Sequence, residues 1–391
     1  MPITVLIGDL DLQVVADPLD AWTSLDVTLR FNEVSSGTIT IPARPEVMAE
    51  LVAGRRITVI RDGQILIAGP IEAPLAAFQW GLPGGEGGGE DAGPGVVTAA
   101  FADDLAFAAG RLVYPNPAQA AGSQTSSHYE AAGAAGTVML GLANLNAGPG
   151  ALEARQIPHL VMGDGTGVGT SVSVRSRFAP LLDELRSAAV NGGGLGFRIR
   201  QDGTDLVFEV YQPVDRTGTA RFSRGLGNLR AVTVEQSAPE ITHAIVGGQG
   251  EDEAREIVER ASTFAAAKWW RIEQWVDSRN EDTTAGLEQS GDEALAESAE
   301  QVRLAAVTVD TPDLAFGTDF DLGDIVTVSP MPGIEIADTV RQAQITATPG
   351  AGEHVTVLVG SQEATSDAVW VSRVKRIQRR LSRLETGTDV A

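Results

Sequence analysis

Histidine ligands and glycine-rich phosphate loops are the first chemical possibilities that the sequence raises. No two histidines stand at the spacing of paired ligands on one helix face or hairpin, and no HExxH pattern occurs. The glycine-rich run 163–171 contains no lysine that could reach the phosphates of a nucleotide. We therefore predict no metal ion and no cofactor. The histidines in question are His128, His159, His243 and His354.

Nucleophiles and acid–base pairs are equally hard to find. The chain has no cysteine and no G-x-S-x-G elbow, while its 52 acidic residues make carboxylate pairs plentiful without showing which lie close in space. Trp269, Trp270 and Trp275 form an aromatic cluster that can stack on sugars or pack in a core or interface. We predict a protein that is not an enzyme. The alternative is a hydrolase or lectin that acts on cell-wall glycan through these tryptophans or an unpaired carboxylate couple.

A short acidic run, Asp319 to Asp324, resembles the first four positions of a calcium loop. The glutamate that such a loop needs further on is missing, and the run leads directly into a predicted strand at 324–328. We therefore predict a turn that Asp321, Gly323 and Asp324 stabilise, with no bound metal.

A second glycine-rich turn follows the predicted strand 242–246. Gly247, Gly248 and Gly250 are three glycines in four residues, which predicts positive φ angles or a close backbone approach. We expect a structural turn, with Arg255 held near acidic neighbours.

The elements that position these residues follow from turn chemistry and hydrophobic period. Asp62-Gly63 predicts a tight hairpin, and Asn191-Gly192 predicts the end of a helix. Helices are expected at 44–53, 137–144, 178–190 and 292–304, and strands at 56–60, 65–67, 196–201, 206–211, 232–236, 242–246, 324–328, 341–346 and 355–359.

Length and composition set the class of protein. A chain of 391 residues predicts two or three domains, and 44 glycines with 19 prolines indicate a turn-rich, mainly β architecture. The balance of 29 basic against 52 acidic residues gives a net charge of −23, which argues against gripping nucleic acid or an anionic membrane. The first twelve residues lack the basic start of a signal peptide, and the glycine-rich run 131–152 does not read as a membrane anchor.

Four segments are expected along the chain. Residues 1–111 form a first β domain with an acidic glycine-rich loop at 81–95, and residues 112–235 form an α/β insert. Residues 236–366 form a second β domain with a helix, and residues 367–391 form a basic amphipathic helix. The pattern G-x-x-[IV]-T-V occurs at 54–59 and again at 323–328, either as a trace of duplication or because strands after glycine turns look alike.

The C-terminal segment has the most regular pattern in the chain. Its apolar residues are spaced 4, 3, 4 and 3, as in an a/d heptad, with six cations between them. So short a helix is marginal in water by itself, so it must pack against the last barrel, in a threefold bundle or in a partner's groove. The stripe consists of Trp370, Val374, Ile377, Leu381 and Leu384.

Several spaced blocks together resemble the tail-tip hub proteins of long, non-contractile-tailed phages of actinobacteria. Their order and spacing cover roughly residues 30–360. The blocks are Phe31 with Ser36-Gly37-Thr38 and Ile41-Pro42, Gly54-Arg55-Arg56-Ile57 with Asp62-Gly63 and Gly69-Pro70-Ile71, the run 244–251 with Arg255, Arg303-Leu304 with Asp319-Phe320, and the run 321–328.

This resemblance implies a fold similar to the baseplate hub of contractile-tailed phages, mainly β with an α/β insert and two tube-like barrel domains in each chain. Three chains would form a ring of six similar units, so that a threefold tip can join a sixfold tail tube. The implied partners are two further copies, the distal tail protein, the tape-measure protein and the tail-fibre or receptor-binding proteins. The implied location is the virion tail tip, after synthesis in the host cytoplasm. Three copies would carry a net charge of −69, which lets DNA pass without being bound.

Overall fold

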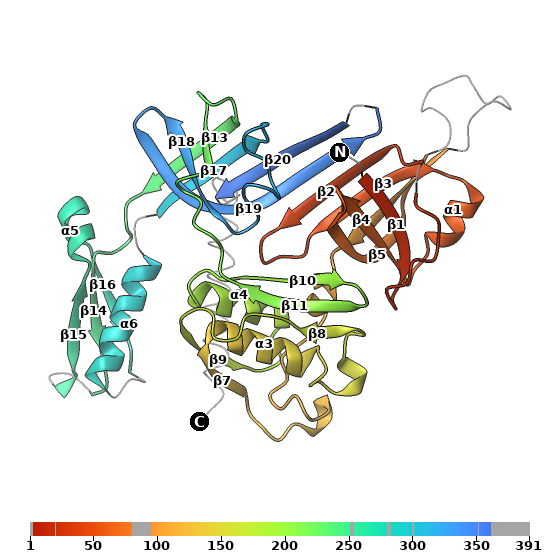
Figure 1. Cartoon of the computed structure of the whole chain (residues 1–391). Coiled ribbons are helices and arrows are strands. Elements are labelled where there is room, and N and C mark those ends of the chain that lie inside the picture. Colours follow the sequence, from red (N-terminus) through yellow and green to blue (C-terminus); the bar gives the residue numbers. More distant parts are fainter. Residues whose placement is uncertain are drawn as a thin grey trace. The chain divides into compact units, whose positions relative to one another are not determined.

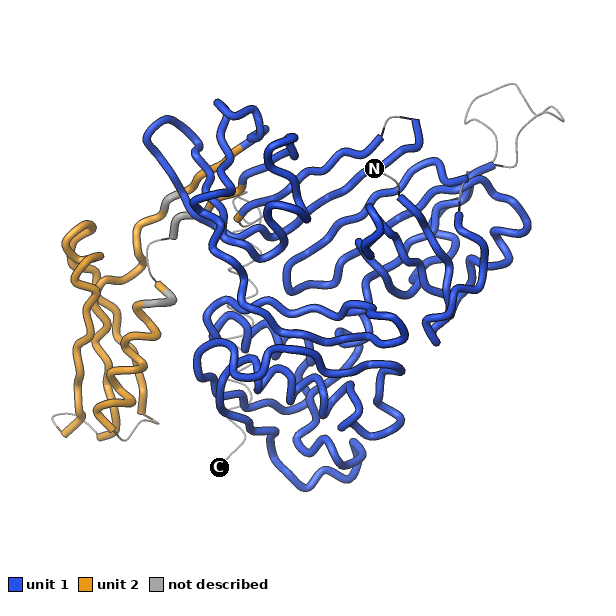
Figure 2. Tube along the Cα trace, in the orientation of Figure 1, with its two compact units in different colours: residues 1–231, 306–359 blue, residues 232–305, 360–391 orange. Residues whose placement is uncertain are grey.

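The computed structural model describes residues 3–19, 21–79, 95–250, 254–279, 283–298, 301–350 and 352–360. These residues group into two compact units, which Figure 2 shows in different colours. Unit 1 combines residues 1–231 with 306–359, and unit 2 is built on residues 232–305. The four-segment division expected from the sequence stays a proposal. Most of the glycine-rich loop (80–94) and the whole C-terminal stripe lie outside the described residues.

Unit 1 contains one large sheet whose strands come from both ends of the chain. The path of hydrogen-bonded neighbours is β1-β4-β5-β6-β3-β2-β19-β20-β17-β13, and β18 pairs with β19 and with the short β12 (Figure 1). The N-terminal part consists of β1 (Ile3–Asp9), β2 (Ser24–Arg30), β3 (Ser36–Pro42), α1 (Pro45–Glu50), β4 (Arg55–Arg61), β5 (Gln64–Gln79), β6 (Val96–Ala102) and α2 (Leu105–Ala109). The C-terminal part consists of β17 (Gln301–Val309), β18 (Ile325–Met331), β19 (Ile334–Thr348) and β20 (Gly352–Gly360).

The antiparallel pairing of β2 with β19 joins these two parts. Its register runs from Gln342 opposite Arg30 to Ala347 opposite Leu25. Alternate residues of β2 are buried, so one face of the joint faces the core while the other is more exposed. The path is open at β1 and β13, and the described strands form no closed barrel.

The predicted hairpin at Asp62-Gly63 is confirmed. Both residues have positive φ, 52° and 80°, as the tight turn between β4 and β5 requires. The short helix expected at 44–53 is also present, as α1. Gly54 and Gly323, which begin the two repeated six-residue patterns, both have positive φ and each precedes a strand that turns into a much longer antiparallel partner.

The middle of unit 1 is an α/β region with its own core. The helices α3 and α4 pack against each other and against small sheets of order β10-β11-β8 and β7-β9. The two predicted helices and the second hairpin are confirmed here, and α4 ends at Asn191 as expected. The elements are η1 (Ala121–Ser123), β7 (Tyr129–Ala134), α3 (Ala135–Asn146), η2 (Glu153–Arg155), β8 (Leu160–Met162), β9 (Ser171–Ser176), α4 (Leu181–Asn191), β10 (Gly196–Asp202), β11 (Asp205–Tyr211) and β12 (Arg221–Ser223).

Unit 2 is a small three-stranded sheet of order β15-β14-β16 with a helix on one face. The acidic helix expected at 292–304 is wrong in its limits, because α6 ends at Glu297 and residues 301–309 form β17. Alternate side chains of β17, at Leu304, Ala306 and Thr308, are buried, which is the period of a strand. The elements are β14 (His243–Gly247), β15 (Ile257–Ala261), α5 (Thr263–Trp269), β16 (Glu273–Asp277) and α6 (Thr284–Glu297). The strand β13 (Leu229–Ser237) belongs to the large sheet and crosses the boundary between the units at residue 231. Among the described residues, none of the helices is both long and apolar enough to span a bilayer.

Candidate functional site

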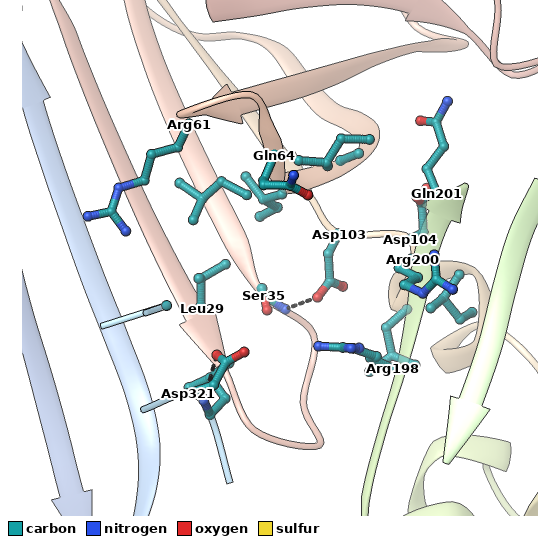
Figure 3. Close-up of a pocket in the computed structure, with 18 of the residues that line it drawn as sticks. Leu29, Ser35, Arg61, Gln64, Asp103, Asp104, Arg198, Arg200, Gln201 and Asp321 are labelled. Carbon is teal, nitrogen blue, oxygen red and sulfur yellow. Dashed lines mark hydrogen bonds between the residues drawn. The ribbon is translucent and has the colours of Figure 1, made fainter. Parts of the chain in front are cut away.

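A cavity of about 810 Å³ lies within unit 1, where the N-terminal strands, the α/β region and the C-terminal strands meet. Figure 3 shows Asp103, from the connection between β6 and α2, and Arg198, from β10, extending into the same space. Asp321 lines the cavity from the turn that precedes β18. The cavity therefore gathers charged side chains from three regions that are far apart in sequence.

An acidic pair, Asp103 and Asp104, stands at the junction between the first strands and the α/β region. Asp104 accepts a hydrogen bond of 2.7 Å from Nη2 of Arg56, and these side chains are only 1% and 2% exposed. Asp103 accepts a hydrogen bond of 3.0 Å from the backbone N–H of Ser35 through Oδ2. The Oδ1 atoms of both aspartates are buried with no hydrogen-bond partner among the described residues.

Burial changes the acidity of this pair. It raises the pKa of Asp103 from 3.8 to about 6, against the opposing effects of the Ser35 hydrogen bonds and the charge of Arg30. Burial also raises the pKa of Asp104, although the Arg56 guanidinium acts in the opposite direction. Sequence reasoning missed both residues. The available signal was two consecutive acids directly after the alternating strand β6, where a charge is forced towards the interior.

Asn32 connects the turn between β2 and β3 to the α/β region by hydrogen bonds. Its side chain donates to the carbonyl oxygen of Leu195 at 2.8 Å and accepts from the N–H of Phe197 at 2.9 Å. Nε of Arg186, on α4, donates to the Asn32 carbonyl at 2.9 Å. Asn32 has a positive φ of 56°, which asparagine tolerates better than most residues. The turn between β2 and β3 is thereby fixed to the start of β10.

The predicted aspartate turn at 321–324 is present. Asp324 is 5% exposed and its carboxylate accepts from the N–H of Asp321 at 3.0 Å, from the N–H of Val214 at 3.0 Å and from Nε of Arg216 at 3.3 Å. Gly323 has a φ of 89°, and a Cβ there would lie 2.4 Å from the ring of Phe31. The turn therefore secures the segment that leaves the α/β region against the start of β18.

The predicted glycine turn lies in unit 2. Arg255 donates from Nε to the carbonyl of Gly248 at 3.0 Å and from Nη2 to that of Gly247 at 3.1 Å, and it pairs with Asp277. A Cβ on Gly247 would lie 2.4 Å from the indole of Trp275, and Gly250 has a φ of 103°. Close approach and positive φ thus explain these glycines, and the acidic neighbour of Arg255 is Asp277.

The two predicted motifs belong to different units. Gly247, Gly250 and Arg255 belong to unit 2, whereas Asp321, Gly323 and Asp324 belong to unit 1. Within the described ranges no group of three or more histidine, aspartate or glutamate side chains is arranged to hold a metal ion. Both motifs therefore stabilise tight turns, the first through the hydrogen bonds of Arg255 and the second through those of Asp324.

The fold is shared with solved phage tail proteins. The chain resembles a 43 kDa tail protein of prophage MuSo2 from Shewanella oneidensis at 12% identity and a TM-score of 0.52, covering 93% of this chain and 99% of that one. It resembles the prophage tail protein gp18 from Listeria monocytogenes at 9% identity and a TM-score of 0.53, covering 96% and 99%. A tail protein from Neisseria meningitidis gives 15% identity and a TM-score of 0.50, covering 94% and 98%.

Comparison by sequence identifies a family for this chain but no individual curated relative. A search of curated proteins found no match. The model of the Siphovirus ReqiPepy6 Gp37-like protein family matches residues 2–361, which is nearly the whole chain and includes both motifs. The chain belongs to the Siphovirus ReqiPepy6 Gp37-like protein family.

Proposed function

We propose that this protein is a structural hub at the distal end of a phage tail tube. Three copies form a ring that adapts the sixfold tube to a threefold tip. The observation that carries the proposal is the single sheet in which β2 of the N-terminal part pairs with β19 of the C-terminal part. Each part contributes a hairpin of the same construction, a positive-φ glycine followed by a strand and a longer antiparallel partner. Two similar tube-like faces per chain, repeated three times, make six.

Fold and charge support the same role. The likeness to phage tail proteins extends over more than nine tenths of the chain in the Shewanella, Neisseria and Listeria structures. A ring of three chains carries a net charge of −69, from −23 per chain, so its wall repels the phosphates of passing DNA. In this role the ring binds the distal tail protein and the tape-measure protein and anchors tail-fibre or receptor-binding proteins. The actinobacterial host is part of the proposal.

The mass in solution tests the assembly. One chain has a mass of 40.9 kDa, so a trimer has a mass of about 123 kDa. Native mass spectrometry of the purified chain, together with a reconstruction of the assembled tail, distinguishes a monomer from a trimer. A single copy, or a monomer with no sheet continuing between chains inside an assembled tail, would refute the hub.

A glycan hydrolase or lectin is the second candidate, and one observation favours it. Trp270 and Trp275 are 66% and 47% exposed, so neither is a core residue and both are accessible to a sugar ring. Muropeptide release from cell walls tests this candidate. Release that is lost when Trp275 is replaced by alanine would support it over the structural hub.

A further inference from the structure

A tight turn joins β12 to β13, the strand at one end of the path through the large sheet. Asn228 closes this turn, because its side chain donates to the carbonyl oxygen of Arg221 at 2.9 Å and accepts from the N–H of Ser223 at 2.9 Å. Leu226 lies within the turn and is 62% exposed. The turn thus holds an apolar side chain out in the solvent. We call residues 221–230 the basic end.

The basic end carries unpaired positive charge in an otherwise acidic chain. Residues 221–230 contain three arginines and no acidic residue, which gives a net charge of +3. Arg221 pairs with Glu335. Arg224 and Arg230 are exposed, and no described carboxylate pairs with either of them. Two cations beside the exposed leucine are therefore available to a partner.

The opposite end of the same strand path has a turn with exposed apolar side chains of its own. The strand β1 ends at Asp9, whose Oδ1 accepts from the N–H of Asp11 at 3.0 Å and from the N–H of Gln13 at 2.9 Å. Around this turn Leu10 is 44% exposed and Val14 is 59% exposed. The hydrogen bonds of the Asp9 carboxylate therefore fix the backbone that presents these two residues.

This second turn is acidic. Residues 9–17, which we call the acidic end, contain three aspartates and no basic residue, which gives a net charge of −3. No described arginine or lysine pairs with Asp9, Asp11 or Asp17. Asp11 has an 81% exposed side chain and lies 3.5 Å from Nε2 of His159. The carboxylates of the acidic end therefore keep their charge for a partner.

The two ends complement each other in charge and in apolar surface, but they do not meet within one chain. The path from β1 to β13 has ten strands, and nine spacings of about 4.8 Å amount to about 43 Å along the sheet. Among the described residues no hydrogen bond or ion pair links the two ends. Complementary surfaces at opposite ends of a subunit make head-to-tail contacts, which form a ring when the rotation between copies closes.

We propose that the basic end of one copy docks on the acidic end of the next copy. Leu226 packs against Leu10 and Val14, and the unpaired arginines Arg224 and Arg230 face the aspartates. Burial of the apolar side chains favours the contact, and the opposite charges determine which ends meet. This inference rests on the proposed hub, because it names the surfaces through which three copies close the ring.

Cross-linking of the full-length protein tests the contact directly, because the chain has no cysteine of its own. In a variant with Val14→Cys and Leu226→Cys, a short bis-maleimide should link copies into covalent dimers and trimers, measured by denaturing mass spectrometry. Val190→Cys with Leu226→Cys is the matched control, since Val190 is 71% exposed on α4, outside both ends. Linking should be at least about fivefold slower in the control. Equal rates, or links within single chains, would overturn the proposal.

Exchange of the charges tests which ends meet. Arg224→Asp with Arg230→Asp places like charges opposite each other and should raise the protein concentration at half-assembly about tenfold, measured by native mass spectrometry. Adding Asp11→Arg and Asp17→Arg to the same chain restores opposite signs and should return assembly to the wild-type concentration. Failure of this fourfold variant to recover would argue against direct contact between the two ends.

The control for charge exchange is Arg44→Asp with Arg175→Asp. It changes the net charge by the same amount at exposed positions outside both ends, and it should leave assembly nearly unchanged. A wild-type trimer that the exchange at the basic end does not weaken would overturn the docking contact and leave the hub intact. A wild type that is monomeric both in solution and in assembled tails would overturn the docking contact and the hub together.

Discussion

Replacing Asp103 by asparagine removes a buried charge while keeping the shape of the side chain, and we expect it to stabilise unit 1. The asparagine oxygen can still accept the 3.0 Å hydrogen bond from the Ser35 N–H. The carboxyl has a pKa of about 6 in the folded chain and 3.8 in the unfolded one. A folded-state pKa that is raised means that ionisation of this acid opposes folding.

The pKa values set the size and pH range of the effect. Above about pH 6 the carboxyl is ionised in both states, and 2.2 pKa units correspond to about 3 kcal/mol of lost stability. Below 3.8 the carboxyl is protonated in both states and the loss disappears. Asp103→Asn should therefore add about 3 kcal/mol at pH 8 and about 1.6 kcal/mol at pH 5. Both pH values lie above the pI of about 4.5.

Asp62→Asn is the matched control, because it removes the same charge from an exposed hairpin turn and should leave the stability of unit 1 nearly unchanged. Hydrogen exchange of the amides of β3 and β6 reports the stability of unit 1 without interference from unit 2. No gain for Asp103→Asn at pH 8, an equal gain at both pH values, or the same gain for Asp62→Asn would refute the reasoning.

Three further substitutions test the turns. Asp324→Ala removes three hydrogen bonds and should lower the stability of unit 1 by about 3 kcal/mol. The measurement is hydrogen exchange of the Val214 amide, which should become faster. An unchanged exchange rate would contradict a stabilising role for the Asp324 hydrogen bonds. Gly247→Val should displace the Trp275 indole, which a Cβ would approach to 2.4 Å, and tryptophan fluorescence should shift to the red; an unshifted spectrum would argue against this contact. Gly250→Val is strained at a φ of 103° and should impair assembly, measured as loss of the trimer mass. A Gly250→Val protein that assembles normally but loses a hydrolytic activity would contradict the structural role of the turn.

The local sequence was sufficient to predict a turn or a helix end wherever the contacts that determine it are only a few residues apart. Asp62-Gly63 fixed a hairpin because both residues adopt positive φ, and Asn191 ended a helix before three consecutive glycines. The aspartate turn at 321–324 was predictable because its side chains bond to backbone groups one to three residues away. The same reasoning failed at 301–304, where strand pairing overrides an apparently continuous acidic helix.

Tertiary structure alone decided how the distant parts meet. The pairing of Arg30 with Gln342 joins residues more than three hundred positions apart, and no turn or period specifies which strand edge meets which. The two acids at 103–104 directly follow an alternating strand, but only the folded chain shows that Asp104 is buried against Arg56.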